Sequence, residues 1–190
     1  MIRKFVALSG TAVLLGSLSA LGCTVSGVGD PCTPESEYKP DFPGFSQKEV
    51  NVESGSFQCQ TRVCLVNHFQ GRTTCPYGST DKPCKIPGTA EGSAPVSVPV
   101  APSCVNRNAA KSVYCSCRCA DVAGRTDDGA NYCKCGDGFT CTQLVTAIET
   151  AERGLTGAYC IKAGTTYSDT DDSCLKCDST KNDCGSVTGR

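Results

Sequence analysis

Apolar and polar residues alternate over only a few short stretches of this chain. Residues 50–52 read apolar, polar, apolar, and residues 61–67 are rich in strand-forming residues, with Gly71 following as a turn residue. Alternation on this scale is typical of a half-buried β-strand. We therefore predict two or three short strands between residues 49 and 75, held by Cys59, Cys64 and Cys75.

One later stretch has helical periodicity instead. Its apolar residues recur every three or four positions, at Leu144, Val145, Ile148 and Ala151. Thr140 or Thr142 can cap the start of such a helix, and Gly154 can end it. The pattern predicts one helix near residues 142–153, with residues 158–162 as a strand that returns after it.

The densest cysteine segment runs from Tyr114 to Cys141 and holds six cysteines, with the sequence YCSC at 114–117 echoed by YCKC at 132–135. In an extended strand, Cys115, Cys117 and Cys119 would share one face, about 6.5 to 7 Å apart. A disulfide needs Cβ atoms within about 4.5 Å. We therefore predict that each of the three bonds to a different part of the chain.

The remaining segments are polar and rich in turn residues. Residues 87–103 carry one charge and no cysteine. They suit an extended linker, or else a long loop or edge strand, because Val96, Val98 and Val100 alternate. We expect five regions: a leader at 1–22, a lipidated cysteine and tether at 23–48, a cysteine-rich strand segment at 49–86, the linker or loop at 87–103, and a second cysteine-rich module at 104–190. The expected fold class is small, disulfide-rich α+β, with short antiparallel strands, one helix and long irregular loops.

Composition explains why cross-links are needed. The chain has 17 cysteines but no tryptophan, six phenylalanines and six tyrosines, so it lacks the large side chains that fill a core. Disulfides at about 2 to 4 kcal/mol each would compensate, and they indicate an oxidising compartment outside the cytoplasm. The formal net charge of −1 gives no electrostatic reason to bind nucleic acid.

The N-terminus has the features of a secretory leader. Arg3 and Lys4 precede a run from 5 to 21 without a charge, and small residues lead to Cys23. A basic segment, a short apolar segment and small residues before a cut describe a signal peptide. Residues 20–23 resemble the lipobox of bacterial lipoproteins, although that family usually has leucine where Ala20 stands. The resemblance implies cleavage before Cys23, lipidation of its thiol, and, because Thr24 rather than aspartate follows, sorting to the outer membrane.

Two further features favour lipidation over a coincidental cysteine after an ordinary leader. Removing Cys23 leaves sixteen of the 17 cysteines, an even number that can all pair. Residues 24–30 read as a short flexible tether. The candidate disulfide cysteines, whose connectivity the sequence leaves open, are Cys32, Cys59, Cys64, Cys75, Cys84, Cys104, Cys115, Cys117, Cys119, Cys133, Cys135, Cys141, Cys160, Cys174, Cys177 and Cys184.

The CxC and CxxC spacings also suggest metal or thiol-redox chemistry. Candidate ligands for copper(I) or zinc are Cys115, Cys117, Cys119, Cys133, Cys135, Cys174, Cys177 and the single histidine, His68. Against this, exported thiols oxidise unless metal arrives first, and the aspartates near Cys174 and Cys177 would raise a thiol pKa. We expect structural disulfides, no metal and no cofactor.

Catalytic patterns are absent from the sequence. There is no GxSxG or HExxH motif, and one histidine cannot build a two-histidine zinc site. Cys64 and His68 would lie some 13 Å apart in a strand. Asp127 and Asp128 could act as acid and base but have the composition of a turn. Calcium could be held by Asp127, Asp128 and Asn131, or by Asp169, Asp171 and Asp172, but neither set has the EF-hand spacing.

Residues 133–141 are similar to the closing half of an EGF-like module, with C-x-C followed by glycine and an aromatic residue. Only Thr140 separates that aromatic from Cys141, which departs from the module's spacing. The likeness implies a small cross-linked extracellular fold and no calcium function. We expect a lipid-anchored cell-envelope protein with a structural or binding role at the surface, a membrane partner through its lipid, and a protein or glycan ligand. The alternative is a metal-handling or thiol-redox lipoprotein.

Overall fold

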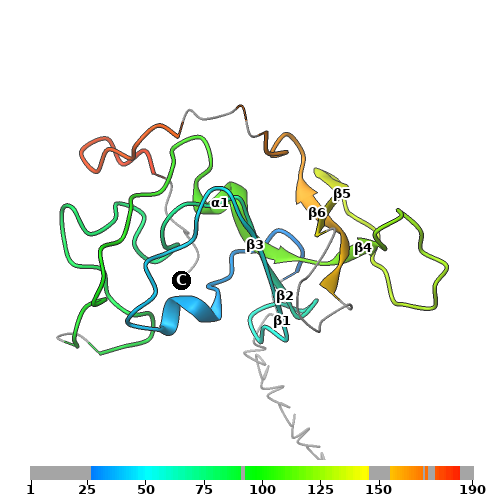
Figure 1. Ribbon diagram of the computed structural model, residues 1–190, viewed down its shortest axis with the longest axis horizontal. Helices are drawn as coiled ribbons and strands as arrows, with labels where there is room; N and C mark the ends of the chain where they lie inside the picture. The colour runs from blue at the N-terminus through cyan, green and yellow to red at the C-terminus, as the bar shows by residue number, and fades with distance from the viewer. Residues whose placement is uncertain (1–26, 91–92, 146–154, 169, 171–173, 185–190) are drawn as a thin grey trace, which may run out of the picture.

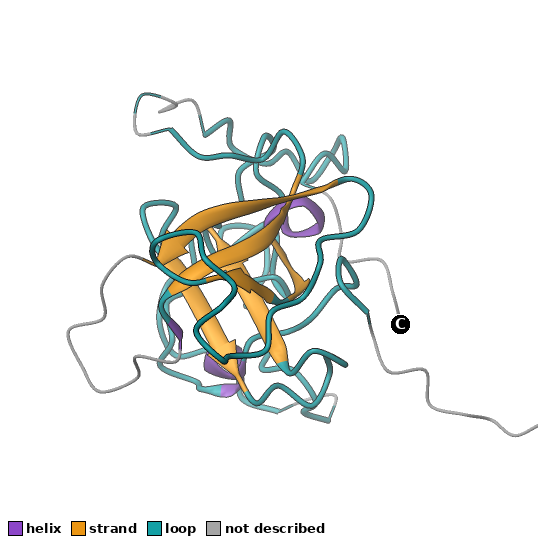
Figure 2. Ribbon diagram, turned by 90° about the vertical axis from the view of Figure 1, so that its right-hand side faces the viewer, coloured by secondary structure: helices purple, strands orange, loops and turns teal. Residues whose placement is uncertain are grey.

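The computed structural model describes residues 27–90, 93–145, 155–168, 170 and 174–184. Two three-stranded antiparallel sheets form its centre, and long loops surround them (Figures 1 and 2). In chain order the elements are η1 (Glu35–Tyr38), β1 (Val50–Ser54), β2 (Val63–Asn67), α1 (Ala109–Ser112), β3 (Val113–Ser116), β4 (Arg118–Ala120), β5 (Phe139–Val145) and β6 (Gly157–Lys162). The prediction of a small, disulfide-rich fold with short antiparallel strands is confirmed.

The first sheet has the strand order β1-β2-β3. Val52 pairs with Leu65, and Leu65 pairs in turn with Tyr114. The strands predicted around residues 50–52 and 61–67 are thus present, as β1 and β2. Gly71, which ends this part of the chain, has a φ of 87°, and a Cβ there would collide with the Ala101 carbonyl oxygen, so only glycine fits.

The second sheet has the order β4-β6-β5. The returning strand predicted at 158–162 is present as β6 and lies at the centre of this sheet, between β4 and β5. Cys141 of β5 stands directly opposite Cys160 of β6. Central position explains why β6 is buried along nearly its whole length.

The predicted helix near 142–153 is wrong in its first residues, because Thr142–Val145 belong to strand β5. Thr142 pairs with Tyr159, and Cys141 is bonded to Cys119 of β4. Cross-strand pairing and this covalent bond override the helical spacing of Leu144 and Val145. Residues 146–154 lie outside the described residues. The helical segments that are described, η1 and α1, have four residues each.

The cysteine-rich strand passes from one sheet to the other. Residues 113–116 form β3 of the first sheet, and residues 118–120 form β4 of the second. Cys117 lies between the two strands and is buried. The segment that the sequence suggested as one strand therefore joins both sheets.

The two sheets share one apolar core. Leu65, Tyr114, Tyr159 and Ile161 are each at most 1% exposed and pack together. The Tyr114 hydroxyl accepts a hydrogen bond of 2.9 Å from the Lys162 backbone N–H. Because side chains alternate along a strand, the cysteines next to these residues point to the opposite faces of the sheets.

Residues 93–103 lie against the preceding loop. The Val96 N–H donates to the Cys84 carbonyl at 2.8 Å, and the Ser103 N–H donates to the Pro76 carbonyl at 2.8 Å. Val96 and Val100 are buried with Cys84 in a small separate cluster. The alternation of valines at 96, 98 and 100 thus corresponds to side chains that pack against residues 75–86.

Candidate functional site

All sixteen cysteines from Cys32 to Cys184 are in disulfides. The pairs are Cys32–Cys64, Cys59–Cys115, Cys75–Cys84, Cys104–Cys174, Cys117–Cys133, Cys119–Cys141, Cys135–Cys160 and Cys177–Cys184. Cys115, Cys117 and Cys119 bond to three different cysteines and not to one another, as the strand spacing predicts. Cys23 lies outside the described residues.

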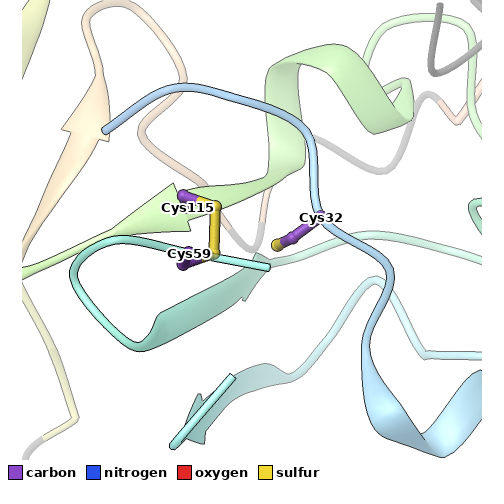
Figure 3. Close-up of side chains that lie close together, drawn as sticks. All are labelled: Cys32, Cys59 and Cys115. Carbon is purple, nitrogen blue, oxygen red and sulfur yellow. A yellow bond between two sulfur atoms is a disulfide. The ribbon is translucent and has the colours of Figure 1, made fainter. Parts of the chain in front are cut away.

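Two disulfides pack together on the face of the first sheet that points away from the shared core. The Sγ atoms of Cys32, Cys59 and Cys115 lie within 4.8 Å of one another (Figure 3). Cys64 completes the group through its bond to Cys32. We call these four residues the closed sulfur cluster, since each is at most 2% exposed.

Three disulfides pack together on the corresponding face of the second sheet. The Cys160 Sγ lies 3.6 Å from the Cys133 Sγ and 3.8 Å from the Cys117 Sγ. On the other side, the Sγ atoms of Cys119, Cys135 and Cys141 lie within 4.8 Å of one another. We call these six residues the open sulfur row, because Cys141 is exposed.

These sulfur groups contain most of the cysteines that the sequence suggested as metal ligands. Each Sγ is covalently bonded to another sulfur, whereas a metal is held by the thiolate form of cysteine. In the disulfide form, the CxC cysteines cross-link strands to loops or, in Cys119–Cys141, one strand to another. Cys174 and Cys177 bond to Cys104 and Cys184, so their CxxC spacing encloses no disulfide of its own.

A cleft of about 420 Å³ opens beside the closed sulfur cluster. We call it the aromatic cleft; its lining residues are Thr33, Glu35, Tyr38, Glu53, Ser54, Gly55, Ser56, Phe57 and Gln58. One wall is Thr33 together with η1, and the other is the end of β1 with the connection from β1 to β2. Cys32 and Cys59 stand next in sequence to the two walls, so the buried disulfides fix both of them.

A side-chain amide joins the two walls directly. The Gln58 Oε1 accepts from the Thr33 N–H at 3.0 Å, and the Gln58 Nε2 donates to the Thr33 carbonyl at 2.7 Å. Together with the two disulfides, this pair of hydrogen bonds holds the cleft at a fixed width. A site that needs no ordering on binding retains more of its interaction energy as affinity.

Two aromatic side chains at the cleft are exposed to solvent. Phe57 is 86% exposed and Tyr38 is 43% exposed. The guanidinium of Arg62 lies 4.3 Å from the centre of the Phe57 ring. Single exposed apolar residues are common, but two aromatic rings on one cleft are a feature of ligand-binding surfaces.

The cleft also holds two carboxylates. The Glu53 Oε2 accepts a hydrogen bond of 2.5 Å from the Glu35 backbone N–H. Partial burial raises the pKa of Glu53 above its usual range, and the like charge of Glu35 adds to this rise, while the Glu35 N–H and the Ser56 hydroxyl oppose it. A ligand that donates hydrogen bonds to Glu53 would replace the solvation that burial removes.

A second, more polar hollow of about 340 Å³ lies between α1 and the residues after β6. Lys111 and Lys162 are among its lining residues. The Lys162 Nζ donates to the Ala110 carbonyl at 2.6 Å and lies 4.8 Å from the centre of the Tyr114 ring. Burial lowers the pKa of Lys162. These contacts give Lys162 a structural role in joining α1 to the second sheet.

The other residues singled out in the sequence lie apart from the aromatic cleft. The His68 Nδ1 lies 2.9 Å from the Gln47 carbonyl, and its ring stacks on Tyr167, while Cys64 is in a disulfide. Asp127, Asp128 and Asn131 are exposed in the loop before β5. The Tyr132 hydroxyl and the Ala130 N–H donate to Asp128 and lower its pKa. Asp169, Asp171 and Asp172 lie outside the described residues.

Searches against protein-family models, curated proteins and solved structures find no match to this chain. Among the described residues, no helix has both the length and the apolar character needed to cross a membrane.

The sequence reasoning missed the aromatic cleft. One signal was present: Phe57 is a single large apolar residue in the otherwise polar stretch ESGSFQ, and a turn residue, Gly55, stands before it. Tyr38 and Glu35 belong to a segment that the sequence indicated only as turns. Their approach to Phe57 depends on Cys32–Cys64 and Cys59–Cys115, a pairing that could not be deduced.

Proposed function

We propose that this protein is exported, anchored by a lipid on Cys23 to the outer membrane of a bacterial envelope, and binds a glycan through the aromatic cleft. Its role is recognition and not catalysis. The observation that carries the proposal is the cleft itself, in which two exposed aromatic rings and two carboxylates are held between walls fixed by buried disulfides.

The disulfide framework supports export and anchoring. Every cysteine of the described residues is paired, and disulfides form outside the reducing cytoplasm. Cys23 is the one cysteine left over, at the position where the lipobox resemblance places the lipid. Gly27, the first residue that the structure describes, is only four positions after Cys23. An anchor at Cys23 would therefore hold the folded part close to the membrane surface.

The composition of the cleft favours a polyhydroxylated ligand. A sugar ring has an apolar face that can stack on Phe57 or Tyr38, and its hydroxyls can donate to Glu35, Glu53 and Gln58. A cationic ligand is the weaker alternative, because the Arg62 guanidinium already lies against the Phe57 ring. Aromatic platforms and a few placed polar groups are the usual composition of a specific small-ligand site.

The anchor is tested by labelling cells that express the full chain with an alkyne analogue of palmitate. The wild-type protein should take up the label and fractionate with the outer membrane, and Cys23→Ser should do neither. Cys23→Ser retains all sixteen disulfide cysteines, so its folding is not compromised. Label on Cys23→Ser, or wild-type protein released from membranes without detergent, would contradict the anchor.

The ligand class is tested by screening the mature protein on an array of bacterial and host glycans, with titration of any hit. Phe57→Ala should weaken binding by about 2 kcal/mol, or roughly thirtyfold, as for a central aromatic residue of an interface. Leu175→Ala is the matched control, because Leu175 is also an exposed apolar residue, at 63%, away from the cleft. Binding of basic peptides but of no glycan would overturn the ligand class, and equal effects of the two variants would overturn the site.

A further inference from the structure

The open sulfur row places three disulfides in direct contact, in a fixed order. Cys117–Cys133 lies against Cys160, Cys160 is bonded to Cys135, and Cys135 lies against Cys119–Cys141. The contacts between neighbouring disulfides are 3.6 Å and 3.8 Å at Cys160, and within 4.8 Å at Cys135. Sulfur atoms of different disulfides are therefore close enough to exchange partners after small movements.

Exposure changes along this row. Cys141 is exposed, and it is the one cysteine of the described residues in that class. Cys135 and Cys133 are half-buried. Cys160, in the centre, is fully buried, and Cys117 is 7% exposed. A thiol from solvent can thus reach the row at Cys141, which lies on an edge strand of its sheet.

We propose that the open sulfur row is a site of thiol–disulfide exchange, at which an external thiolate bonds to Cys141 and the displaced thiolate moves along the row. The reacting ligand is a thiol, carried by a small molecule or by a cysteine of another exported protein. This activity goes beyond glycan binding and uses a different part of the molecule.

The exchange proceeds in three steps, and in each step a thiolate attacks a disulfide, one S–S bond forms and one breaks. The external thiolate attacks the Cys141 Sγ, which breaks Cys119–Cys141 and frees the Cys119 thiolate. Cys119 attacks the Cys135 Sγ, forms Cys119–Cys135 and frees the Cys160 thiolate. Cys160 attacks Cys133 and frees Cys117, or attacks Cys117 and frees Cys133.

The number of disulfide bonds is the same before and after these steps. One thiolate is consumed at Cys141 and one, on Cys117 or Cys133, is set free at the far end of the row, so no oxidant or reductant is consumed. The backbone holds the reacting segments in place meanwhile, since the Cys160 N–H donates to the Cys117 carbonyl at 3.1 Å and the Cys133 N–H donates to the Arg118 carbonyl at 3.0 Å.

The test treats the oxidised mature protein with a stoichiometric amount of reduced glutathione in one arm and of a short peptide carrying one cysteine in the other. Acid quenching, maleimide labelling and peptide mapping then locate the adduct and the free thiols. We expect the adduct at Cys141, maleimide at Cys117 or Cys133, and new cross-links Cys119–Cys135 and Cys160–Cys133 or Cys160–Cys117. An adduct with glutathione but not with the peptide identifies a small-molecule thiol as the source, and reaction in both arms admits a protein thiol.

The control variant is Cys135→Ala/Cys160→Ala, which removes the middle disulfide. It should still give the Cys141 adduct, now with maleimide on Cys119, and its label at Cys117 and Cys133 should fall to that of a sample without thiol. Should this variant fail to fold, the new cross-links in the wild-type protein still decide the question. Wild-type label confined to Cys119, or no adduct at Cys141, would overturn the proposal.

Discussion

The two sulfur groups have the same construction and differ in access. In the first sheet, Cys64 and Cys115 stand directly opposite each other on β2 and β3, and each bonds to a third segment. In the second sheet, Cys141 and Cys160 stand opposite each other on β5 and β6 and do the same. Directly opposite Cβ atoms are about 4.5 to 5.5 Å apart, longer than the mean of about 3.8 Å in a disulfide, which favours bonds to other segments.

The difference lies in what covers each group. The closed sulfur cluster is packed among buried apolar residues that include Phe45, Phe69 and Val113. Beside it, η1 and the β1–β2 connection form the aromatic cleft. The open sulfur row ends at an edge strand, where Cys141 is exposed. The same cross-strand arrangement therefore fixes the walls of the aromatic cleft in the half built on the first sheet, and in the half built on the second sheet it leaves a disulfide with an exposed cysteine.

The largest difference between the halves should appear when one disulfide is removed from each. Cys59–Cys115 closes a separation of 56 residues and Cys117–Cys133 closes one of 16. As single cross-links, these loops predict losses of about 4 and about 3 kcal/mol in the free energy of unfolding for the paired alanine variants. Urea denaturation checks the order, and a reversed order would show that loop length does not govern these bonds.

The same pair of variants separates the roles of the halves. Cys59→Ala/Cys115→Ala releases one wall of the aromatic cleft and should weaken glycan binding. Cys117→Ala/Cys133→Ala should leave binding unchanged, because it touches neither wall. Equal binding by both variants would contradict the proposed link between the closed sulfur cluster and the cleft.

A smaller effect is expected where the halves meet. Tyr114→Phe removes the acceptor for the Lys162 N–H and leaves that donor buried between the sheets, which costs about 1 to 3 kcal/mol. Tyr132→Phe is the control, because its hydroxyl bonds to exposed Asp128, and it should change stability by less than about 0.5 kcal/mol. Thermal unfolding followed by near-ultraviolet dichroism compares them; equal stability of the two variants would contradict a shared core.

The smallest effect is a difference in pH response. The pKa of Glu53 is raised by burial, so its ionisation destabilises the first half as pH rises from its ordinary range through the folded-state pKa. The pKa of Asp121, in the second half, is lowered by hydrogen bonds from Arg125 and Ala123, so its contribution is present above its ordinary pKa and is lost as pH falls through the folded-state value. Glu53→Gln should gain a few tenths of a kcal/mol at neutral pH, and Asp121→Asn should lose stability there.

Denaturation series at pH 3 to 7 measure both variants against the wild-type protein. The gain of Glu53→Gln should disappear below the ordinary glutamate range, and the loss of Asp121→Asn should shrink as pH falls. Parallel curves for the two variants would show that these carboxyl groups do not respond in opposite directions.

The sequence predicted the strands well, because their signal is local. The alternation at 50–52, the β-branched residues at 61–67 and the run at 158–162 are strands in the structure. The helical spacing of Leu144 and Val145 was misleading, because β5 is set by pairing with β6 and by a bond to Cys119. Local periodicity carries no information about a pairing strand that follows twelve or more residues later in the sequence.

The candidate sites could not be predicted from the sequence for the same reason. Spacing showed that Cys115, Cys117 and Cys119 must bond elsewhere, but it left their partners open. The aromatic cleft needs the segments of Tyr38 and Phe57 to meet at one cleft, and the open sulfur row needs Cys160 against Cys133. Both depend on the actual disulfide pairing. Exposure of Cys141, which decides where a thiol can react, has no counterpart in the sequence pattern.

The most direct test of the contrast between the halves is a time course of limited reduction. The oxidised protein is treated with a small amount of dithiothreitol, and maleimide labelling at each time is mapped to individual cysteines. We expect cysteines of the open sulfur row to be labelled on the order of tenfold or more faster than Cys32, Cys59, Cys64 and Cys115, because attack on a disulfide requires access to its sulfur. Equal rates in the two groups, or earlier labelling of the closed sulfur cluster, would contradict this account.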